Sequence, residues 1–593
     1  MRILLVNLML LISFSSFAQI PEILKAQLED KIVQDEISRY YITPTRIVWT
    51  SDSSGQTVTN PDILLQKGNG QTYFGIDKSK VCQLITEEND TTGFILDFGT
   101  ELHGGLQLTT ATSNRLTPKV RIRFGESVSE TMSTVIGDGT TGLCGGATNH
   151  HAMRDFEINL PGYGTLEIGN TGFRFVRIDL VDPSARVAFK EIRAVAVLRN
   201  LPYLGSFKCN DERLNQIWIT GAYTVHLNMQ DFLWDGIKRD RMVWMGDMHP
   251  ELMAINTVFG YNEIVPKSLD FGRDHTPLPK WMNGISAYSM WWIVMQYDWY
   301  LYQGNLDYVK EQRNYLIALL KQLMDNVDES GKENLINTRR FLDWPSSENK
   351  QAVHAGLHAL MVLAFDRGAK LCSYLNENEM ASNCTQMVTK MKKYVPDANH
   401  SKQAATLMSL SGIIPAEKAD QEIISIDSCK NFSTFYGYYM LEAQALAGDY
   451  SLAVKNIRDF WGGMLDMGAT TFWEDFNLEW TKNAAGITEI VPEGKKDIHS
   501  DFGNYCYLGL RHSLCHGWSS GPTSWLTRHV LGIEVLEPGC KTLRIIPHLA
   551  DLDWAEGSFP TPYGIVTVKH QKQDDGTITS NINAPQEIKI IRE

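Results

Sequence analysis

The sequence predicts a protein of several domains, in which a helical segment of the α/α toroid class lies between two antiparallel β-sandwich domains. Two observations lead to this prediction. A chain of 593 residues is too long for one hydrophobic core. Its apolar residues alternate with a period of two near both ends and recur with a helical period in between. We therefore expect the order β, α, β along the chain.

Residues 1–18 have the pattern of a cleavable secretory signal. Arg2 precedes an apolar run, and Ser16-Phe17-Ala18 provides small residues before the cut. No cysteine follows the cut that could carry a lipid, so we expect export to the periplasm or the medium without a membrane anchor. Loss of Arg2 changes the formal charge from −14 to −15, which disfavours a nucleic-acid partner.

Residues 19–200 are predicted to form the first β-sandwich, after a leading segment that ends near residue 62. Phe94–Phe98, Val120–Phe124 and Phe173–Leu180 alternate apolar and polar residues between glycine-rich turns. A loop at residues 145–151 contains two histidines, which are more typical of a surface than of a ligand site.

Residues 201–531 have the apolar spacing of about a dozen helices. Clear examples are residues 287–303, 309–326, 353–375, 377–394, 435–447 and 452–461. So many helices joined by short turns predict a toroid whose loops gather around a cleft at one end, with the polar segment 479–501 as a wall or lid.

Residues 532–593 return to a period of two. Leu543–Ile546 and Ile565–His570 alternate between proline-containing breaks, which predicts the C-terminal β-sandwich. The nine cysteines form no CxxC or Cys/His cluster, so no zinc site is expected, while a Cys372–Cys384 disulfide stays open.

Ionisable side chains are concentrated in residues 235–251. The stretch contains Asp235, Lys238, Arg239, Asp240, Arg241, Trp244, Asp247 and Glu251. The aspartates are five and seven residues apart, so they cannot share one helix face, and we expect a loop or a helix entrance. Crowded carboxylates with arginines beside them acquire pKa shifts of opposite sign, which allows one site to hold an acid and a base.

A second acidic position, Trp473-Glu474, lies far along the chain. Two carboxylates beside aromatic faces are what cleavage of a glycosidic bond needs. The alternative is that Glu474 serves only as a helix cap or in an ion pair. Among the tryptophans of the helical stripes we place one, Trp292, in the cleft. His512 and His516 have the spacing of a metal pair, but a core or sugar-binding histidine is favoured, and we expect no metal or cofactor.

The order of these motifs resembles the α-L-rhamnosidases of glycoside hydrolase family 78. The matching segments are Asp235 to Asp247, Trp473-Glu474, residues 516–525, residues 547–557 and, in the first β-domain, residues 96–105. The resemblance implies a six-hairpin (α/α)6 barrel and an exo-acting, inverting hydrolase that releases terminal α-L-rhamnose from a polysaccharide or glycoside.

By position, the resemblance makes Asp240 the general acid and Glu474 the general base. It gives sugar-binding roles to Asp235, Trp244, Asp247 and His516, and we add Arg239, Trp292 and Trp473 as further sugar-binding candidates. An inverting site keeps its two carboxyls roughly 6.5–9.5 Å apart to leave room for water.

The chain departs from the family pattern at the acid. The family usually has glutamate where this sequence has Asp240, which is one methylene shorter, so Glu251 is an alternative acid. Gly236-Ile237-Lys238 replaces the usual Cys-Pro-Gln, which marks a short and divergent branch. Two other functions stay open: a polysaccharide lyase on the same toroid, and a sugar-binding protein without activity. Aglycone, linkage and oligomeric state are not fixed by the sequence.

Overall fold

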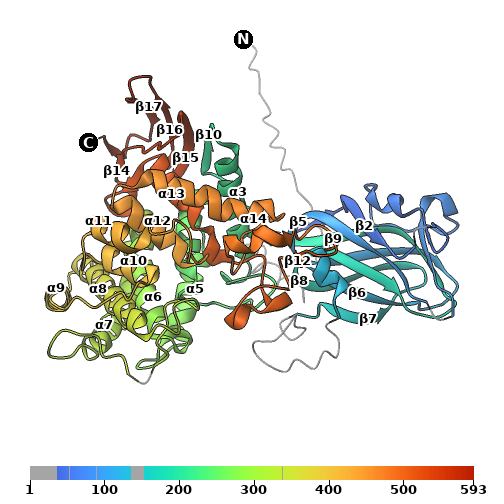
Figure 1. Cartoon of the computed structure of the whole chain (residues 1–593), viewed down its shortest axis with the longest axis horizontal. Coiled ribbons are helices and arrows are strands. Elements are labelled where there is room, and N and C mark those ends of the chain that lie inside the picture. The colour runs from blue at the N-terminus through green and yellow to red at the C-terminus, as the bar shows by residue number, and fades with distance from the viewer. Residues whose placement is uncertain (1–36, 53, 89, 135–151, 337, 593) are drawn as a thin grey trace, which may run out of the picture.

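The computed structural model describes residues 37–592 except 53, 89, 135–151 and 337. The predicted signal at residues 1–18 and the histidine loop at residues 145–151 lie outside these described residues. Figure 1 shows a β-domain, a helical domain and, beside the helices, the C-terminal strands. No helix in the described part of the chain is both long and apolar enough to cross a bilayer.

The N-terminal domain is a sheet of nine strands. They are β1 (Ile37–Ile42), β2 (Arg46–Thr50), β3 (Val58–Thr59), β4 (Cys82–Ile85), β5 (Thr92–Ser113), β6 (Lys119–Gly125), β7 (Asp155–Asn159), β8 (Gly164–Leu180) and β9 (Arg186–Arg199). The main order is β3-β4-β9-β5-β8-β6-β7, with β1 beside β9 and β2 beside β5, and all pairs are antiparallel.

The strands expected around Phe94, Val120 and Phe173 are confirmed as parts of β5, β6 and β8. Strands β1, β2 and β3 precede the predicted start near residue 62. Their sequences gave no clear signal because β1 is half-exposed throughout and lacks a buried alternating face.

The middle of the chain is helical. The α-helices are α3 (Glu212–Asn228), α4 (Met248–Val258), α5 (Ile264–Asp274), α6 (Ser286–Gln303), α7 (Leu306–Met324), α8 (Lys350–Tyr374), α9 (Asn378–Met391), α10 (Lys402–Leu410), α11 (Ala416–Ala419), α12 (Tyr436–Leu446), α13 (Tyr450–Asn456), α14 (Gly462–Asp466) and α15 (Gly521–Trp525). Five of the six predicted helices are confirmed, with ends that differ by less than one turn. The sixth, predicted at residues 452–461, is α13 followed by a π-helical segment at Ile457–Trp461.

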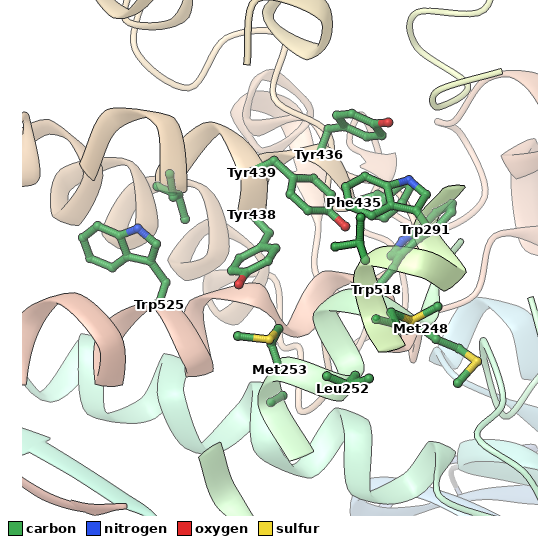
Figure 2. Packing of buried hydrophobic residues seen from close by; sticks show 14 of the residues in the cluster. Met248, Leu252, Met253, Trp291, Phe435, Tyr436, Tyr438, Tyr439, Trp518 and Trp525 are labelled. Atoms are coloured by element: carbon green, nitrogen blue, oxygen red, sulfur yellow. The ribbon is translucent and has the colours of Figure 1, made fainter. Parts of the chain in front are cut away.

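Six of these helices contact one another in a closed sequence. Helix α4 packs on α6, α6 on α8, α8 on α10, α10 on α12, α12 on α15, and α15 on α4. Large apolar and aromatic side chains fill the middle of this ring, where Trp291, Phe435, Tyr439 and Trp518 lie close together (Figure 2). Burial of such side chains is the main term that stabilises the domain.

The C-terminal strands form two small sheets beside the helices (Figure 1). The strands are β10 (Ser206–Cys209), β13 (Ile533–Val535), β14 (Thr542–Ile545), β15 (Trp554–Thr561), β16 (Gly564–Lys572), β17 (Ile578–Asn583) and β18 (Lys589–Ile591). The sheet orders are β10-β15-β16-β17 and β13-β14-β18. Because β10 precedes the helices, the chain enters the helical domain through a strand of the C-terminal sheet. Cys372 and Cys384 are free buried thiols, so the disulfide left open by the sequence is not formed.

Candidate active site

The predicted acidic loop joins α3 to α4 and pairs with a segment almost 280 residues further along. Gly236 forms an isolated antiparallel bridge with His516, and Gly517 N donates to Asp235 O at 2.8 Å. A side chain at Gly236 would meet the Arg239 and Cys515 carbonyl oxygens at 2.7 and 3.0 Å. Glycine at this position therefore allows the two site segments to approach.

Asp235 organises the loop from inside. Its Oδ2 accepts a hydrogen bond from Asp240 N at 3.0 Å, and its Oδ1 accepts one from Met242 N at 2.9 Å. Burial and the nearby Asp240 charge raise the pKa of Asp235 to about 7, although the two N–H donors act in the other direction. Asp235 thus fixes the backbone that carries Asp240.

Arg239 connects the two carboxyls that the sequence assigns to catalysis. Its Nη2 lies 2.5 Å from Glu474 Oε2, and its Nη1 lies 3.2 Å from Asp240 Oδ1. Its Nε donates to Arg511 O at 2.8 Å, which holds the guanidinium in place. Asp240 and Glu474 are therefore brought together on two arms of one buried cation.

Glu474 is held from several sides. Its Oε2 accepts from Ser513 N at 3.1 Å, and its backbone oxygen accepts from Thr434 Oγ1 and Trp518 Nε1. His516 Nε2 lies 3.8 Å from Glu474 Oε1 and 3.6 Å from Asp235 Oδ2. Burial raises the pKa of Glu474, whereas the Arg239 charge lowers it.

Asp247 lies at the N-terminus of α4, where the helix dipole favours a carboxylate. Tyr288, in the first turn of α6, donates from its hydroxyl to Asp247 Oδ1 at 2.8 Å. Burial raises the pKa of Asp247 well above its usual value, and the Asp235 charge adds to this rise. Trp244 is partly exposed and packs edge-on against Tyr288, so it lies beside this carboxyl.

Three of the predicted site residues are fully buried in the protein interior. Trp292 is fully buried and its indole N–H donates to Leu269 O at 3.1 Å, which places it in the helical core and not with the carboxyls. Trp473 is also fully buried and packs on Phe476. Glu251 is fully buried behind Asp247, against Gly517. The burial of a helical tryptophan depends on packing partners that the sequence does not name.

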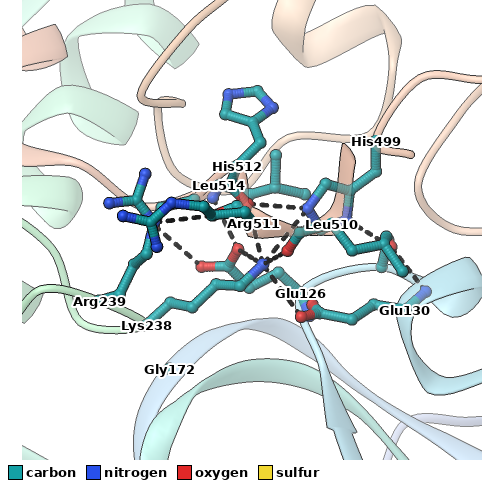
Figure 3. Close-up of polar contacts among 12 residues, drawn as sticks. Glu126, Glu130, Gly172, Lys238, Arg239, His499, Leu510, Arg511, His512 and Leu514 are labelled. Carbon is teal, nitrogen blue, oxygen red and sulfur yellow. Dashed lines mark hydrogen bonds and ion pairs between the residues drawn. The ribbon is translucent and has the colours of Figure 1, made fainter. Parts of the chain in front are cut away.

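The first β-domain contacts the acidic loop through a buried ammonium group. Lys238 Nζ lies 3.2 Å from Glu126 Oε2 and 3.0 Å from Glu130 Oε1, and donates to Leu510 O and His512 O at 2.6 and 2.9 Å (Figure 3). A buried pair of carboxylates needs such a cation nearby.

Glu126, Glu130 and His499 have donor atoms close enough to share a metal ion. Lys238 Nζ already lies beside all three residues, because it is also 3.4 Å from His499 Nε2. Burial, and after it the Lys238 charge, lower the pKa of His499 to about 4. The Lys238 ammonium group and the Arg154 guanidinium, whose Nη2 lies 3.0 Å from Glu130 Oε2, therefore supply the positive charge at this position.

Three residues of the site were not foreseen. The buried ion pairs of Lys238 were not predicted, because a lysine next to arginines in sequence is typical of an exposed, charged surface. Tyr288 lies in an apolar helical stripe and shows no polar role in sequence. Asp475 was overshadowed by Glu474, and burial raises its pKa to about 7, with the Glu474 charge adding to the rise.

Comparisons with known proteins agree with the fold. The model of the bacterial α-L-rhamnosidase six-hairpin glycosidase domain matches residues 202–412, and that of the bacterial α-L-rhamnosidase C-terminal domain matches residues 532–590. An α-L-rhamnosidase of Alteromonas sp. (strain LOR) is 23% identical over 465 residues, which are 70% of this chain and 48% of that protein.

Two solved structures share the fold. A family 78 rhamnosidase of Bacillus sp. GL1 superposes with a TM-score of 0.70 at 22% identity, covering 88% of this chain and 55% of that one. A Klebsiella oxytoca rhamnosidase with rhamnose bound has a TM-score of 0.63 at 19% identity, covering 83% and 96%. The chain spans about half the length of the curated relative that it matches. The matches to the six-hairpin glycosidase and C-terminal domain models of bacterial α-L-rhamnosidases confirm the predicted resemblance to glycoside hydrolase family 78.

Proposed function

We propose that this protein is an exo-acting, inverting glycoside hydrolase that releases terminal α-L-rhamnose from a glycan or glycoside. The observation that carries the proposal is the position of Asp240 and Glu474, which are far apart in sequence and contact opposite arms of the Arg239 guanidinium. Two carboxyl groups held close together support the proposal of an acid and a base.

In the proposed reaction Asp240 gives its proton to the glycosidic oxygen, and the bond from that oxygen to the anomeric carbon breaks. A water molecule attacks the anomeric carbon from the opposite face and loses its proton to Glu474. The products are rhamnose of inverted anomeric configuration and the alcohol of the leaving group. The Arg239 charge favours the ionised form of Glu474, which a base requires.

Asp240 fits the acid role better than Glu251 does. Its side chain is 15% exposed, whereas Glu251 is fully buried. An added Cβ at Gly517 would lie only 1.7 Å from Glu251 Oε1, so Glu251 faces protein backbone. Aspartate at position 240 has a shorter side chain than glutamate. Its backbone N–H donates a hydrogen bond to Asp235, which fixes the main chain beside Arg239.

The finer architecture belongs to the same proposal. We infer that α4, α6, α8, α10, α12 and α15 form the inner ring of a closed (α/α)6 toroid, since their contacts return to the starting helix. The β-domains at both ends are inferred to be sandwiches. Export through the signal at residues 1–18, to the periplasm or the medium, and action without a metal or cofactor are parts of the proposal.

The deciding experiment is a screen of the purified protein against an aryl α-L-rhamnoside and rhamnose-containing polysaccharides, with the released sugar identified. NMR of the first anomer formed tests inversion. Glu474→Gln should reduce kcat by about 10²–10⁴-fold, which is the usual contribution of a general base, and leave binding in place. An unsaturated product would replace the proposal by a lyase, and rhamnose binding without turnover would replace it by a sugar-binding protein.

A further inference from the structure

A cavity of about 720 Å³ opens at the end of the helical ring that faces away from the catalytic carboxyls. It is lined by residues of α6 between Trp291 and Tyr302, by residues of α12 between Tyr438 and Leu446, and by residues 532–548 of the C-terminal domain. The catalytic groups lie at the N-terminal ends of the same helices, where Tyr288 of α6 holds Asp247 and Thr434, just before α12, holds Glu474. The two sites are therefore at opposite ends of the ring.

An aromatic partition separates the cavity from the catalytic end. His249 stacks on Trp291 and Tyr439, with ring centroids 5.2 and 5.7 Å apart, and those two rings stack on each other at 4.7 Å. His249 also bonds to Tyr439 Oη at 3.0 Å and to Asp298 Oδ2 at 2.9 Å. All four residues line the cavity, and Figure 2 shows Trp291 and Tyr439 in this packing.

The charged groups of the cavity balance one another. Its lining contains three arginines and three carboxylates: Arg367, Arg528, Arg544, Asp298, Glu442 and Glu534. A charged ligand would be attracted by three of these groups and repelled by the other three. A purely apolar ligand would displace water from six ionic groups without replacing the hydrogen bonds that the water makes. The lining therefore favours a neutral ligand with several hydrogen-bonding groups.

Glu442 offers a position for such a ligand. Its Oε2 is paired with Arg528 at 2.9 Å and with His529 at 3.2 Å. Its Oε1 is buried and has no hydrogen-bond partner among the described residues. A buried carboxylate oxygen normally has a partner, and a hydroxyl group entering the cavity would supply one.

Flat aromatic faces complete the lining. Tyr450 stacks on His548 of the C-terminal domain at 3.7 Å and is partly exposed, and Arg367 covers the Tyr297 ring at 4.8 Å. Aromatic faces beside a few fixed polar groups are how proteins bind molecules with one apolar face and many hydroxyls.

We propose that this cavity is a second carbohydrate-binding site, for a neutral sugar unit, with Glu442 as a hydroxyl acceptor and Tyr450 as a stacking face. Its volume lies within the range of roughly 300–1,000 Å³ typical of small-molecule sites. The site would hold a glycan segment away from the catalytic end, and it does not depend on the proposed hydrolysis.

The test is calorimetry of the full chain carrying Glu474→Gln, titrated separately with L-rhamnose, D-glucose, D-galactose, D-xylose and the acidic sugar D-galacturonate. We expect at least one neutral sugar to bind in an event that is lost in Ala445→Trp, which fills the cavity from α12, and in Tyr450→Ala, which removes the stacking face. Ala447→Trp, at the end of the same helix and outside the lining, should retain the event.

Circular dichroism melts identify any variant that fails to fold, and Tyr450→Ala adds no bulk, so it decides the matter if Ala445→Trp is unstable. Isotherms that are the same in all three variants would overturn the proposal, and so would a preference for D-galacturonate. The same substitutions are also made in the protein that keeps Glu474, and hydrolysis of an aryl rhamnoside by these variants is measured. This assay reports on the catalytic end alone, so failure of the hydrolase proposal is distinguished from failure of this one.

Discussion

The guanidinium of Arg239 contacts the carboxylate of Glu474 at 2.5 Å, inside a site where both side chains are almost completely buried. Burial acts to keep Glu474 protonated, and the Arg239 charge opposes it. A general base must be ionised before it can accept a proton from water. Arg239 therefore has an electrostatic role in addition to any contact with the sugar.

Replacement of this cation should move the pH dependence of hydrolysis. In Arg239→Met the pKa of Glu474 rises, so the base becomes ionised only at higher pH and the acidic limb of kcat/KM shifts upward. Arg239→Lys keeps the charge and should shift the limb less, while losing the two-armed contact. The measurement is kcat/KM across pH for an aryl α-L-rhamnoside. If the acidic limb of the kcat/KM profile lies at the same pH in the unsubstituted protein and in both variants, this role of Arg239 is contradicted.

The acid assignment predicts a dependence on the leaving group. Asp240→Asn cannot protonate the glycosidic oxygen, so an alkyl or glycosyl rhamnoside should lose about 10²–10⁴-fold in kcat. A nitrophenyl rhamnoside leaves as a stable phenolate and should lose far less. Glu251→Gln should keep the normal ratio between the two substrates. If Glu251→Gln shows the leaving-group effect and Asp240→Asn does not, the acid is Glu251.

The hydrogen bond from Tyr288 to Asp247 predicts a binding defect. Tyr288→Phe removes the donor that stabilises the Asp247 carboxylate, whose pKa burial already raises. The proposed sugar-binding role of Asp247 then predicts weaker binding, and we expect KM to rise by roughly tenfold, the equivalent of one lost hydrogen bond. Tyr300→Phe, further along the same helix, serves as the control. A fall in kcat with unchanged KM would contradict this prediction, because it would place the effect of Tyr288 on the catalytic step and not on sugar binding.

The architecture was predictable because apolar periodicity is a local property, and the helices around Ala287 and Tyr436 follow it closely. The meeting of Asp240 with Glu474 was predictable only through the order of family motifs, since no local pattern links residues so far apart. Trp292 shows the limit of this reasoning, because its stripe predicts burial on one face but not that the indole reaches the Leu269 carbonyl in the core. Lys238 shows another limit, since only the folded β-domain supplies its carboxylate partners.

That contact brings the β-domain next to the proposed catalytic residues. Lys238 precedes Arg239, and strand β8 approaches so closely that a Cβ on Gly172 would lie 2.8 Å from Lys238 N. Lys238→Met leaves Glu126 and Glu130 buried with less positive charge beside them, which should cost about 3–5 kcal/mol of unfolding free energy in urea denaturation. It should also lower kcat, because Arg239 loses its fixed neighbour.

The exposed pair of Lys482 with Glu479 provides the matched control, and Lys482→Met should change stability by less than about 1 kcal/mol. Adding Glu126→Gln to Lys238→Met removes the carboxylate that has lost its ion pair, whereas Glu130 keeps its ion pair with Arg154, so the double variant should be more stable than Lys238→Met alone. If the double variant regains stability but not kcat, Lys238 positions the catalytic loop. If it regains both, the loss of activity came only from partial unfolding, and the positioning role is wrong.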